Sequence, residues 1–202
     1  KLISHPDGSF GYQSLIDKIP SKYQDFGNVW EILEVNGTII FQSYDYLCIL
    51  DDNHFEIIEP SATFGYAGVC NKQLFILDQD QLYTLNVDNS RFTPFITTEQ
   101  INNEEILEIL PGNEKQSVFI ITKEGALYTV NTNTRDIQKT QSLTIPGSNP
   151  VFTSAIRSSS GIIYTGTLSH HLISWDPGNG RLEKIRSFPE LQDQTVLGLF
   201  EG

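Results

Sequence analysis

The residues best suited to chemistry in this sequence are aromatic side chains that stand close to hydrogen-bonding groups. Such a mixture suits the binding of a sugar, because flat rings cover apolar patches while polar groups fix hydroxyls. The candidates in the first third of the chain are Trp30, Gln42, Tyr44, Asp45, Tyr46 and Tyr66. For Trp30 we favour packing inside a strand over ligand contact, and for Tyr44 the two roles are equally good interpretations.

His170 is a further ligand-binding candidate, because it lies in a polar segment between two apolar strands. His170 and His171 together suggest a metal or acid–base site, but adjacent residues of an extended chain point to opposite sides. The pair therefore fits a solvated turn. Asp78 and Asp80 have a spacing found among calcium ligands, yet the glycine and the distal glutamate of an EF-hand loop are missing. We expect no bound metal.

The sequence contains none of the short motifs that mark common enzyme classes. It has no G-x-S-x-G, no H-E-x-x-H and no glycine-rich phosphate loop. Asp51 with Asp52, and Glu104 with Glu105, are neighbours within turns and lead-ins, so we expect solvated surface and not two carboxyls facing each other across a substrate. We therefore predict a protein that is not an enzyme and carries no cofactor.

The charge of the chain limits its partners. The 25 acidic and 13 basic residues give a net charge of −12, which repels phosphate backbones and anionic lipid surfaces. Nucleic acid is therefore an unsuitable partner for this segment. No apolar stretch reaches the roughly 18 residues of a membrane-spanning helix. The first six residues have no signal-peptide core, so we expect that any targeting segment has been removed.

Cys48 and Cys70 each lie inside an apolar run, without the CxxC or histidine spacing of a zinc site. We expect both to be small core residues. A disulfide between them stays open as an alternative in an oxidising compartment.

The fold is indicated by a pattern that occurs four times along the chain. Each copy has three apolar strands separated by short turns, and the third strand ends in Asp or Asn before a fourth strand. The third copy is the clearest, with strands near residues 106–110, 117–122, 125–131 and 136–139. The copies begin 35 to 45 residues apart, at Val29, Phe64, Ile106, Val151 and Val196.

A repeat of this length is typical of one blade of a β-propeller. Each small sheet is apolar on both faces, so it must pack against a neighbour on each side. A β-sandwich is the alternative, but a sandwich requires no such repeat. We predict an all-β fold, a β-propeller with about four four-stranded blades present, as part of a larger propeller of the seven-bladed type.

We expect the chain to begin and end within blades. The expected divisions are the end of a preceding blade and a connector in 1–28, blades in 29–63, 64–105, 106–150 and 151–194, and the first strand of the next blade in 195–202. Propellers usually bind ligands on the face that carries the loops between second and third strands and the loops entering each blade. His170 and Tyr44 belong to such loops.

Two stretches resemble a known family. Residues 191–201, Leu-Gln-Asp-Gln-Thr-Val-Leu-Gly-Leu-Phe-Glu, resemble the L-x-N-x-x-V-x-x-I-x-E-D lead-in of two-component regulator propeller repeats, and residues 26–32 are similar. Residues 12–47 resemble the first blades of periplasmic sensor proteins of Bacteroidetes. In those proteins a propeller is followed by a three-tyrosine β-domain, a membrane helix and a cytoplasmic transcriptional output. The family phrase G-x-L-W-I-G-T corresponds to residues 161–167, Gly-Ile-Ile-Tyr-Thr-Gly-Thr.

The resemblance implies a periplasmic signal-input domain of an inner-membrane regulator, which senses a glycan fragment or another small nutrient ligand. Its partners would be that small molecule or oligosaccharide, the remainder of its own propeller, the downstream three-tyrosine domain and a second copy in a homodimer. A protein-interaction scaffold without a small-molecule ligand is the alternative, which fold resemblance supports equally well. A propeller enzyme acting on glycans is the third interpretation.

Overall fold

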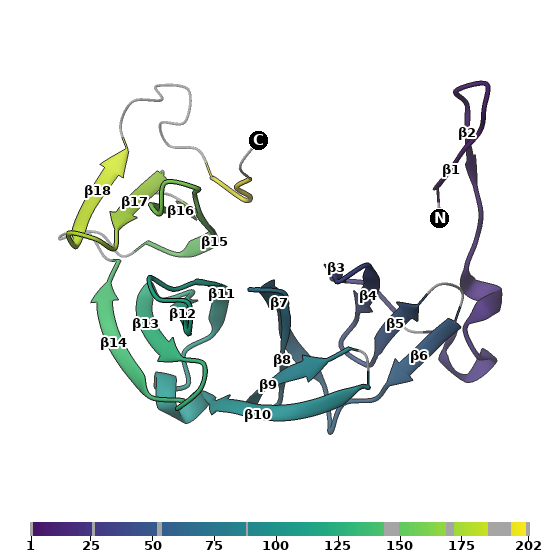
Figure 1. The fold of residues 1–202 in the computed structure, drawn as a ribbon, viewed down its shortest axis with the longest axis horizontal. Helices are drawn as coiled ribbons and strands as arrows, with labels where there is room; N and C mark the ends of the chain where they lie inside the picture. The colour runs from purple at the N-terminus through teal and green to yellow at the C-terminus, as the bar shows by residue number, and fades with distance from the viewer. Residues whose placement is uncertain are drawn as a thin grey trace.

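Four antiparallel sheets of four strands each stand side by side in an arc (Figure 1). The computed structural model describes residues 2–25, 27–51, 54–87, 89–143, 150–168, 172–185 and 195–200. Within each sheet the strands follow chain order, from an inner strand on the concave side of the arc to an outer strand on the convex side. The all-β propeller architecture with four blades, predicted from the repeat, is confirmed.

The strands of the four sheets have the following bounds. The first sheet contains β3 (Glu31–Val35), β4 (Thr38–Gln42), β5 (Leu47–Asp51) and β6 (His54–Ile58). The second contains β7 (Phe64–Cys70), β8 (Gln73–Asp78), β9 (Gln81–Asn86) and β10 (Arg91–Thr97). The third contains β11 (Ile106–Pro111), β12 (Ser117–Thr122), β13 (Ala126–Asn131) and β14 (Ile137–Ser142). The fourth contains β15 (Phe152–Arg157), β16 (Ile163–Thr167), β17 (Leu172–Asp176) and β18 (Arg181–Ile185).

The apolar residues of the central strands divide between the two neighbouring sheets. In β12, Val118 and Ile120 pack in the core shared with the second sheet, whereas Phe119 and Ile121 pack in the core shared with the fourth sheet. Successive side chains of a strand point to opposite faces, so an uninterrupted apolar run supplies both cores. The sheets are therefore held together by their faces, as the repeat requires.

The N-terminal segment lies against the outward face of the first sheet. A hairpin of β1 (Leu2–Ser4) and β2 (Phe10–Tyr12) projects from the arc, so residues 10–12, which the sequence assigned to a polar connector, pair with residues 2–4 (Figure 1). Two short 3-10 helices follow, η1 (Ile16–Lys18) and η2 (Ser21–Tyr23). Between them, Ile19 packs with Cys48 and Phe55. A third 3-10 helix, η3 (Thr98–Ile101), leads into the third sheet.

Both cysteines are free and buried, as expected for small core residues. Burial raises the pKa of Cys48 to about 11. Burial, together with the nearby Glu108 carboxylate, raises the pKa of Cys70 to about 12. Because the thiolate is the reactive form, neither thiol is activated for nucleophilic chemistry at neutral pH.

The turns between third and fourth strands use side-chain acceptors, as predicted from the Asp and Asn residues there. Asn131 Oδ1 accepts hydrogen bonds from the backbone N–H groups of Asn133 and Thr134, at 2.9 and 3.0 Å. In the fourth sheet, Asp176 Oδ1 accepts from the N–H of Gly178 at 2.8 Å. These bonds close the hairpins and hold the register of the outer strands.

Gly125, in the loop between β12 and β13, provides a test of face-to-face packing. Its φ is +82°, and a Cβ atom there would collide with the Phe152 ring of the next sheet. Gly37 has a similar φ of +87° but open space around it. Both alanine variants meet backbone strain, and only Gly125→Ala adds overpacking. We expect Gly125→Ala to lower the free energy of unfolding by about 2 kcal/mol more than Gly37→Ala, measured by urea denaturation. Equal losses would contradict this packing.

Candidate functional site

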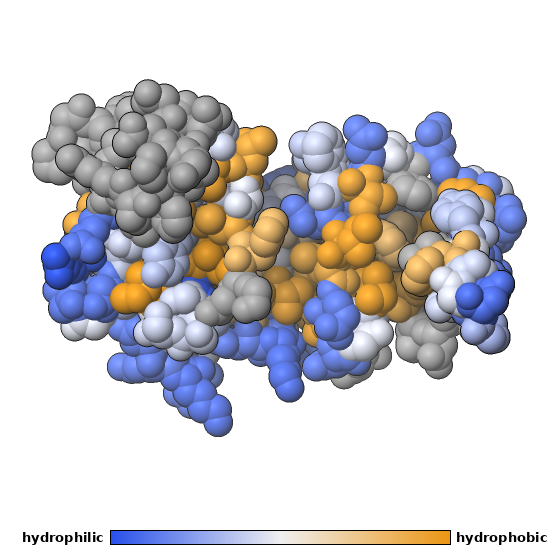
Figure 2. All heavy atoms as spheres, turned by 90° about the horizontal axis from the view of Figure 1, so that it is seen from above, coloured by the Kyte–Doolittle hydropathy of each residue, from blue (hydrophilic) through white to orange (hydrophobic). Residues whose placement is uncertain are grey.

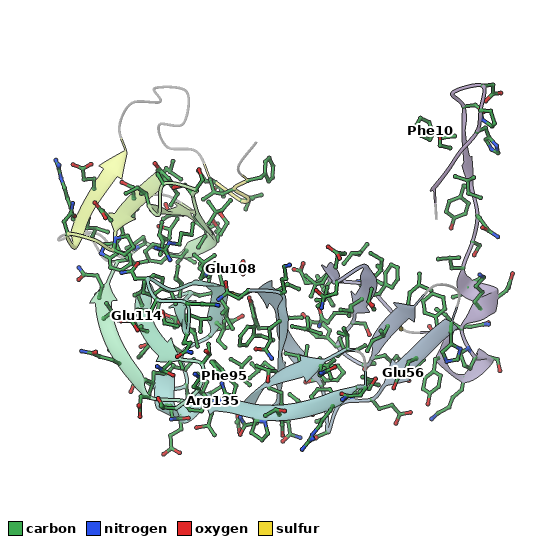
Figure 3. The ribbon with its side chains drawn as sticks, viewed as in Figure 1. Phe10, Glu56, Phe95, Glu108, Glu114 and Arg135 are labelled. Atoms are coloured by element: carbon green, nitrogen blue, oxygen red, sulfur yellow. The ribbon has the colours of Figure 1, made fainter. Side chains whose placement is uncertain are left out.

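A pocket with a volume of about 680 Å³ opens on the concave side of the arc, among the inner strands β3, β7 and β11. Figure 2 views the molecule from above, toward this side, and shows apolar residues gathered between polar rims. The lining combines aromatic and acidic side chains, among them Trp30, Glu31, Tyr44, Tyr66 and Glu108. Figure 3 shows Glu108 on this concave side.

Four lining residues occupy the same position in the repeat. The third residue counted from each repeat start is, in chain order, Glu31, Tyr66, Glu108 and Thr153. The stacking of the sheets brings these equivalent positions of the inner strands together. Of these four residues only Tyr66 was a candidate from the sequence, although the alignment of the repeats carries the signal for the other three.

Irregular pairing of the inner strands helps to direct these side chains. The β7–β8 register shifts between Phe64 and Ala67, so Tyr66 lies in the irregular part. The β15–β16 register shifts between Phe152 and Ser154, on either side of Thr153. A β-bulge bends its strand and changes the direction of the side chains beside it. The bulges can therefore turn Tyr66 and Thr153 toward the pocket, whereas Glu31 lines it from a strand whose pairing is regular.

Tyr66 connects the second and third sheets at the base of the pocket. Its hydroxyl donates to Glu108 Oε1 at 2.9 Å and accepts from the backbone N–H of Ile109 at 3.1 Å. A Cβ atom at position 68 would collide with this hydroxyl, so Gly68 leaves the room that the tyrosine needs. The pair of hydrogen bonds fixes both the ring and the carboxyl group.

Two carboxyl groups of the pocket, those of Glu31 and Glu108, hold protons more strongly than ordinary glutamates do. Burial raises the pKa of Glu108, and the nearby Glu31 carboxylate raises it further, while the hydrogen bond from Tyr66 opposes the rise. Burial likewise raises the pKa of Glu31. Burial and the Glu108 charge raise the pKa of Tyr66, so its hydroxyl remains a donor at neutral pH. The pocket thus presents both donors and acceptors.

Trp30 and Tyr44 form an exposed aromatic pair at the mouth of the pocket. Their ring centroids are 5.1 Å apart with the planes tilted by 46°, and each side chain is 52% exposed. Trp30 precedes β3 and is held there by a backbone hydrogen bond of 2.8 Å from its N–H to the carbonyl of Gln42. Trp30 is therefore less buried than we expect of a residue that packs inside a blade, and half of its surface is exposed.

The other sequence candidates are separated by the fold. Gln42 lines the pocket but is buried, and its amide donates to the backbone carbonyls of Ser43 at 3.0 Å and Gly65 at 3.3 Å. It therefore positions the neighbouring loop. Tyr46 packs edge-on against Tyr23 of the N-terminal segment, with ring centroids 5.1 Å apart.

Two further candidates lie elsewhere. Asp45 is exposed in the turn between β4 and β5 and is not part of the pocket lining. His170 lies outside the described residues.

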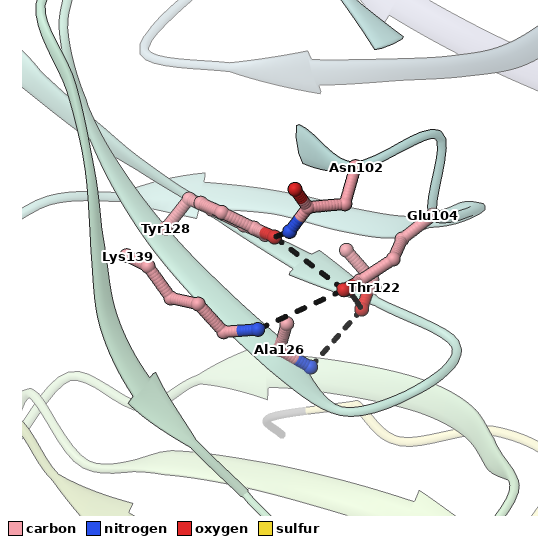
Figure 4. Close-up of polar contacts among 6 residues, drawn as sticks. All are labelled: Asn102, Glu104, Thr122, Ala126, Tyr128 and Lys139. Atoms are coloured by element: carbon pink, nitrogen blue, oxygen red, sulfur yellow. Dashed lines mark hydrogen bonds and ion pairs between the residues drawn. The ribbon is translucent and has the colours of Figure 1, made fainter. Parts of the chain in front are cut away.

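A polar network holds the segment through which the chain enters the third sheet (Figure 4). Glu104 accepts a hydrogen bond of 2.8 Å from Thr122 and lies 3.7 Å from Lys139 Nζ. Asn102 donates to the hydroxyl of Tyr128 at 2.9 Å. The Glu104 side chain is only 19% exposed, so our expectation of solvated surface is wrong for this residue. Because Glu104 accepts a hydrogen bond from the buried Thr122, it belongs to the packed third sheet.

Next to this network, Glu105 and Lys123 form an ion pair and both line the pocket. The backbone N–H of Lys123 also donates to the carbonyl of Glu105 at 2.8 Å. Among the described lining residues Lys123 is the only lysine, and these two contacts hold it beside the Glu105 carboxylate.

Within the described ranges, no group of three or more His, Cys, Asp or Glu side chains is arranged to hold a metal ion. The same part of the chain contains no helix with the length and apolar character needed to cross a membrane.

No family model and no curated protein matches the chain by sequence. Solved structures do match it, and three of them illustrate the range. The first is the extracellular domain of a putative one-component system from Bacteroides thetaiotaomicron, with a TM-score of 0.57 and 19% identity over 78% of this chain and 21% of that one. The second is the extracellular domain of a putative hybrid two-component system from the same organism, with a TM-score of 0.56 and 13% identity over 77% of this chain and 23% of that one.

The third match is the WD40 β-propeller domain of Doa1, with a TM-score of 0.61 and 13% identity over 85% of this chain and 56% of that one. The chain spans between a fifth and just over half of these three structures. At such identities the likeness establishes the propeller fold and leaves function to be argued from the site.

The coupling between the pocket carboxyls can be measured directly. Because the Glu31 charge raises the pKa of Glu108, we expect Glu31→Gln to lower the Glu108 pKa, as followed by ¹³C NMR of the carboxyl during a pH titration. Glu34→Gln removes a charge from the same lining and should leave the Glu108 pKa nearly unchanged. An equal shift in both variants, or none in Glu31→Gln, would show that the two groups are not coupled.

The same coupling predicts a dependence of stability on pH. A carboxyl whose pKa is higher in the folded state binds more protons folded than unfolded, so stability falls as pH rises from the ordinary glutamate pKa of about 4.3 to the folded value. We expect Glu31→Gln to reduce this fall, as measured by urea denaturation at a series of pH values.

Proposed function

We propose that the chain is the ligand-binding part of an extracellular sensor and that the concave pocket binds a glycan fragment or a related small nutrient ligand. The observation that carries this proposal is the half-exposed pair of Trp30 and Tyr44 beside the carboxyls of Glu31 and Glu108. Aromatic faces stack on the apolar face of a sugar ring, and carboxyl and phenol groups exchange hydrogen bonds with its hydroxyls. The function is binding, without catalysis.

The charge of the pocket narrows the ligand class. Glu31, Glu34, Glu105 and Glu108 all contribute to the lining, and Lys123 is already paired with Glu105. Carboxylates in a confined site repel anions. A neutral oligosaccharide therefore suits the pocket better than a uronate or a sulfated glycan.

The similar extracellular domains of the two Bacteroides regulators support a role in signal input. In this proposal the chain belongs to the periplasmic ectodomain of an inner-membrane regulator. The remaining blades complete the propeller, and a downstream three-tyrosine β-domain in a homodimer carries the signal toward the membrane. Binding in the concave pocket would suit signal input, because one ligand would contact several blades and change how they pack against one another.

Calorimetric titration of the complete ectodomain with neutral xylo-, gluco- and manno-oligosaccharides tests the proposal. We expect one series to bind, and Trp30→Ala or Tyr44→Ala to weaken its binding about tenfold through loss of stacking. Tyr12→Ala is the matched control, because Tyr12 is 83% exposed and absent from the pocket lining. It should leave the affinity unchanged.

Two results would count against the sensor proposal. Binding that is equally tight in the Trp30 and Tyr44 variants would place the sugar elsewhere. Absence of binding to any neutral oligosaccharide, together with binding of a protein partner, would favour the protein-interaction scaffold.

A further inference from the structure

A second concavity lies at the opposite end of the strands from the concave pocket. This groove has a volume of about 630 Å³ and runs between the third and fourth sheets. Its lining comes from the turns β11–β12, β13–β14 and β17–β18 and the strand ends beside them. Ser117, at the start of β12, lines the groove, whereas Lys123, just beyond the end of the same strand, lines the concave pocket. The two concavities are therefore separate.

Trp175 supplies an unused hydrogen-bond donor in the lining of the groove. Its side chain is 3% exposed, and within the described part of the chain its indole Nε1 has no hydrogen-bond partner. The ring is held edge-on against Phe119, with centroids 5.6 Å apart. A buried polar group without a partner has lost its hydrogen bonds to water, and an acceptor brought by a ligand would replace them.

Two carboxylates stand at the rim of the groove without a cation. Glu114 is exposed, and its carboxylate has no partner among the described residues. Asp136 accepts a hydrogen bond of 2.6 Å from Thr134 Oγ1 but has no ion pair within the same ranges. Among the described residues, the nearby guanidinium groups form no ion pair with these carboxylates. Arg157 donates to the Asn113 side chain at 2.8 Å and lies over the Phe119 ring at 5.4 Å, and both of these partners line the groove. Arg135 covers the ring of Phe95 at 4.6 Å.

The buried rings distinguish between ligand classes. A sugar site needs an exposed aromatic face, but Trp175 and Phe119 are 3% and 2% exposed. The groove instead has the buried, unpaired indole N–H of Trp175 in its wall, two carboxylates without an ion pair among the described residues, and polar side chains such as Gln138 and Thr140 of the outer strand β14. A main-chain carbonyl matches the indole N–H, and a basic side chain matches the carboxylates.

We propose that this groove binds an extended basic peptide segment of a partner protein. One main-chain carbonyl of the peptide accepts the indole N–H of Trp175, and a lysine or arginine side chain one or two residues away reaches Glu114 and Asp136. The proposal is independent of the sugar pocket, because it uses different residues at the other end of the blades.

The indole signal of Trp175 provides a direct test. The chain has two tryptophans, so the indole N–H signal that persists in Trp30→Phe belongs to Trp175. We expect acetyl-Gly-Arg-Gly-Gly-amide to shift this signal in ¹H–¹⁵N NMR spectra, saturating with a Kd of about 1 mM. The matched peptide with Glu in place of Arg, and maltotriose as a neutral sugar, should leave the signal in place.

Charge-removing variants test the rim. Glu114→Gln and Asp136→Asn should each weaken binding of the arginine peptide about threefold, the usual scale of an exposed ion pair. Glu56→Gln removes an exposed charge from the first sheet, away from Glu114 (Figure 3), and should change nothing. An unchanged position of the Trp175 signal in each peptide-free variant verifies that the groove is intact.

Three outcomes would overturn the proposal. The first is an arginine peptide that leaves the Trp175 signal unmoved. The second is an equal shift by the glutamate peptide, which would remove the role of the carboxylates. A shift produced by maltotriose but not by the arginine peptide would identify the groove as a second sugar site. Because each outcome is read at Trp175, failure of the concave sugar pocket would not affect the result.

Discussion

The structure depends on the fact that each four-stranded sheet is apolar on both faces. Alternate residues of β12 enter two different cores, with Val118 on one side and Phe119 on the other. A sheet of this kind cannot be covered by a single neighbour, and stacking around an axis satisfies each sheet in turn. The burial of an aromatic or aliphatic side chain contributes about 1.5–3 kcal/mol, so these cores dominate the stability of the arc.

Stacking by faces also creates the concave pocket. Every inner strand ends up on the concave side, so residues that are 35 to 45 positions apart in the sequence come together there. The hydrogen bond between Tyr66 and Glu108 joins neighbouring sheets at this place. Backbone hydrogen bonds also hold the loops. The N–H of Phe64 donates to the carbonyl of Tyr44 at 2.8 Å, and the N–H of Thr98 donates to the carbonyl of Asp80 at 2.8 Å.

The two ends of the blades therefore have different chemistry. The concave pocket offers the exposed rings of Trp30 and Tyr44 beside carboxyls, which is an arrangement suited to a small polyhydroxylated molecule. The groove between the third and fourth sheets has its rings buried and its carboxylates free, and suits a peptide.

The repeat of apolar strands by itself determined the propeller architecture, the buried cysteines and the side-chain acceptors of the hairpin turns, because these follow from local periodicity and from the need to cover two faces. The sequence also singled out Trp30, Tyr44 and Tyr66. Only the tertiary structure decided which residues share a site: Tyr46 packs against Tyr23, while Glu31 and Glu108 line one pocket. Such convergence depends on bulges and on the stacking of distant strands, which no single stretch of sequence specifies.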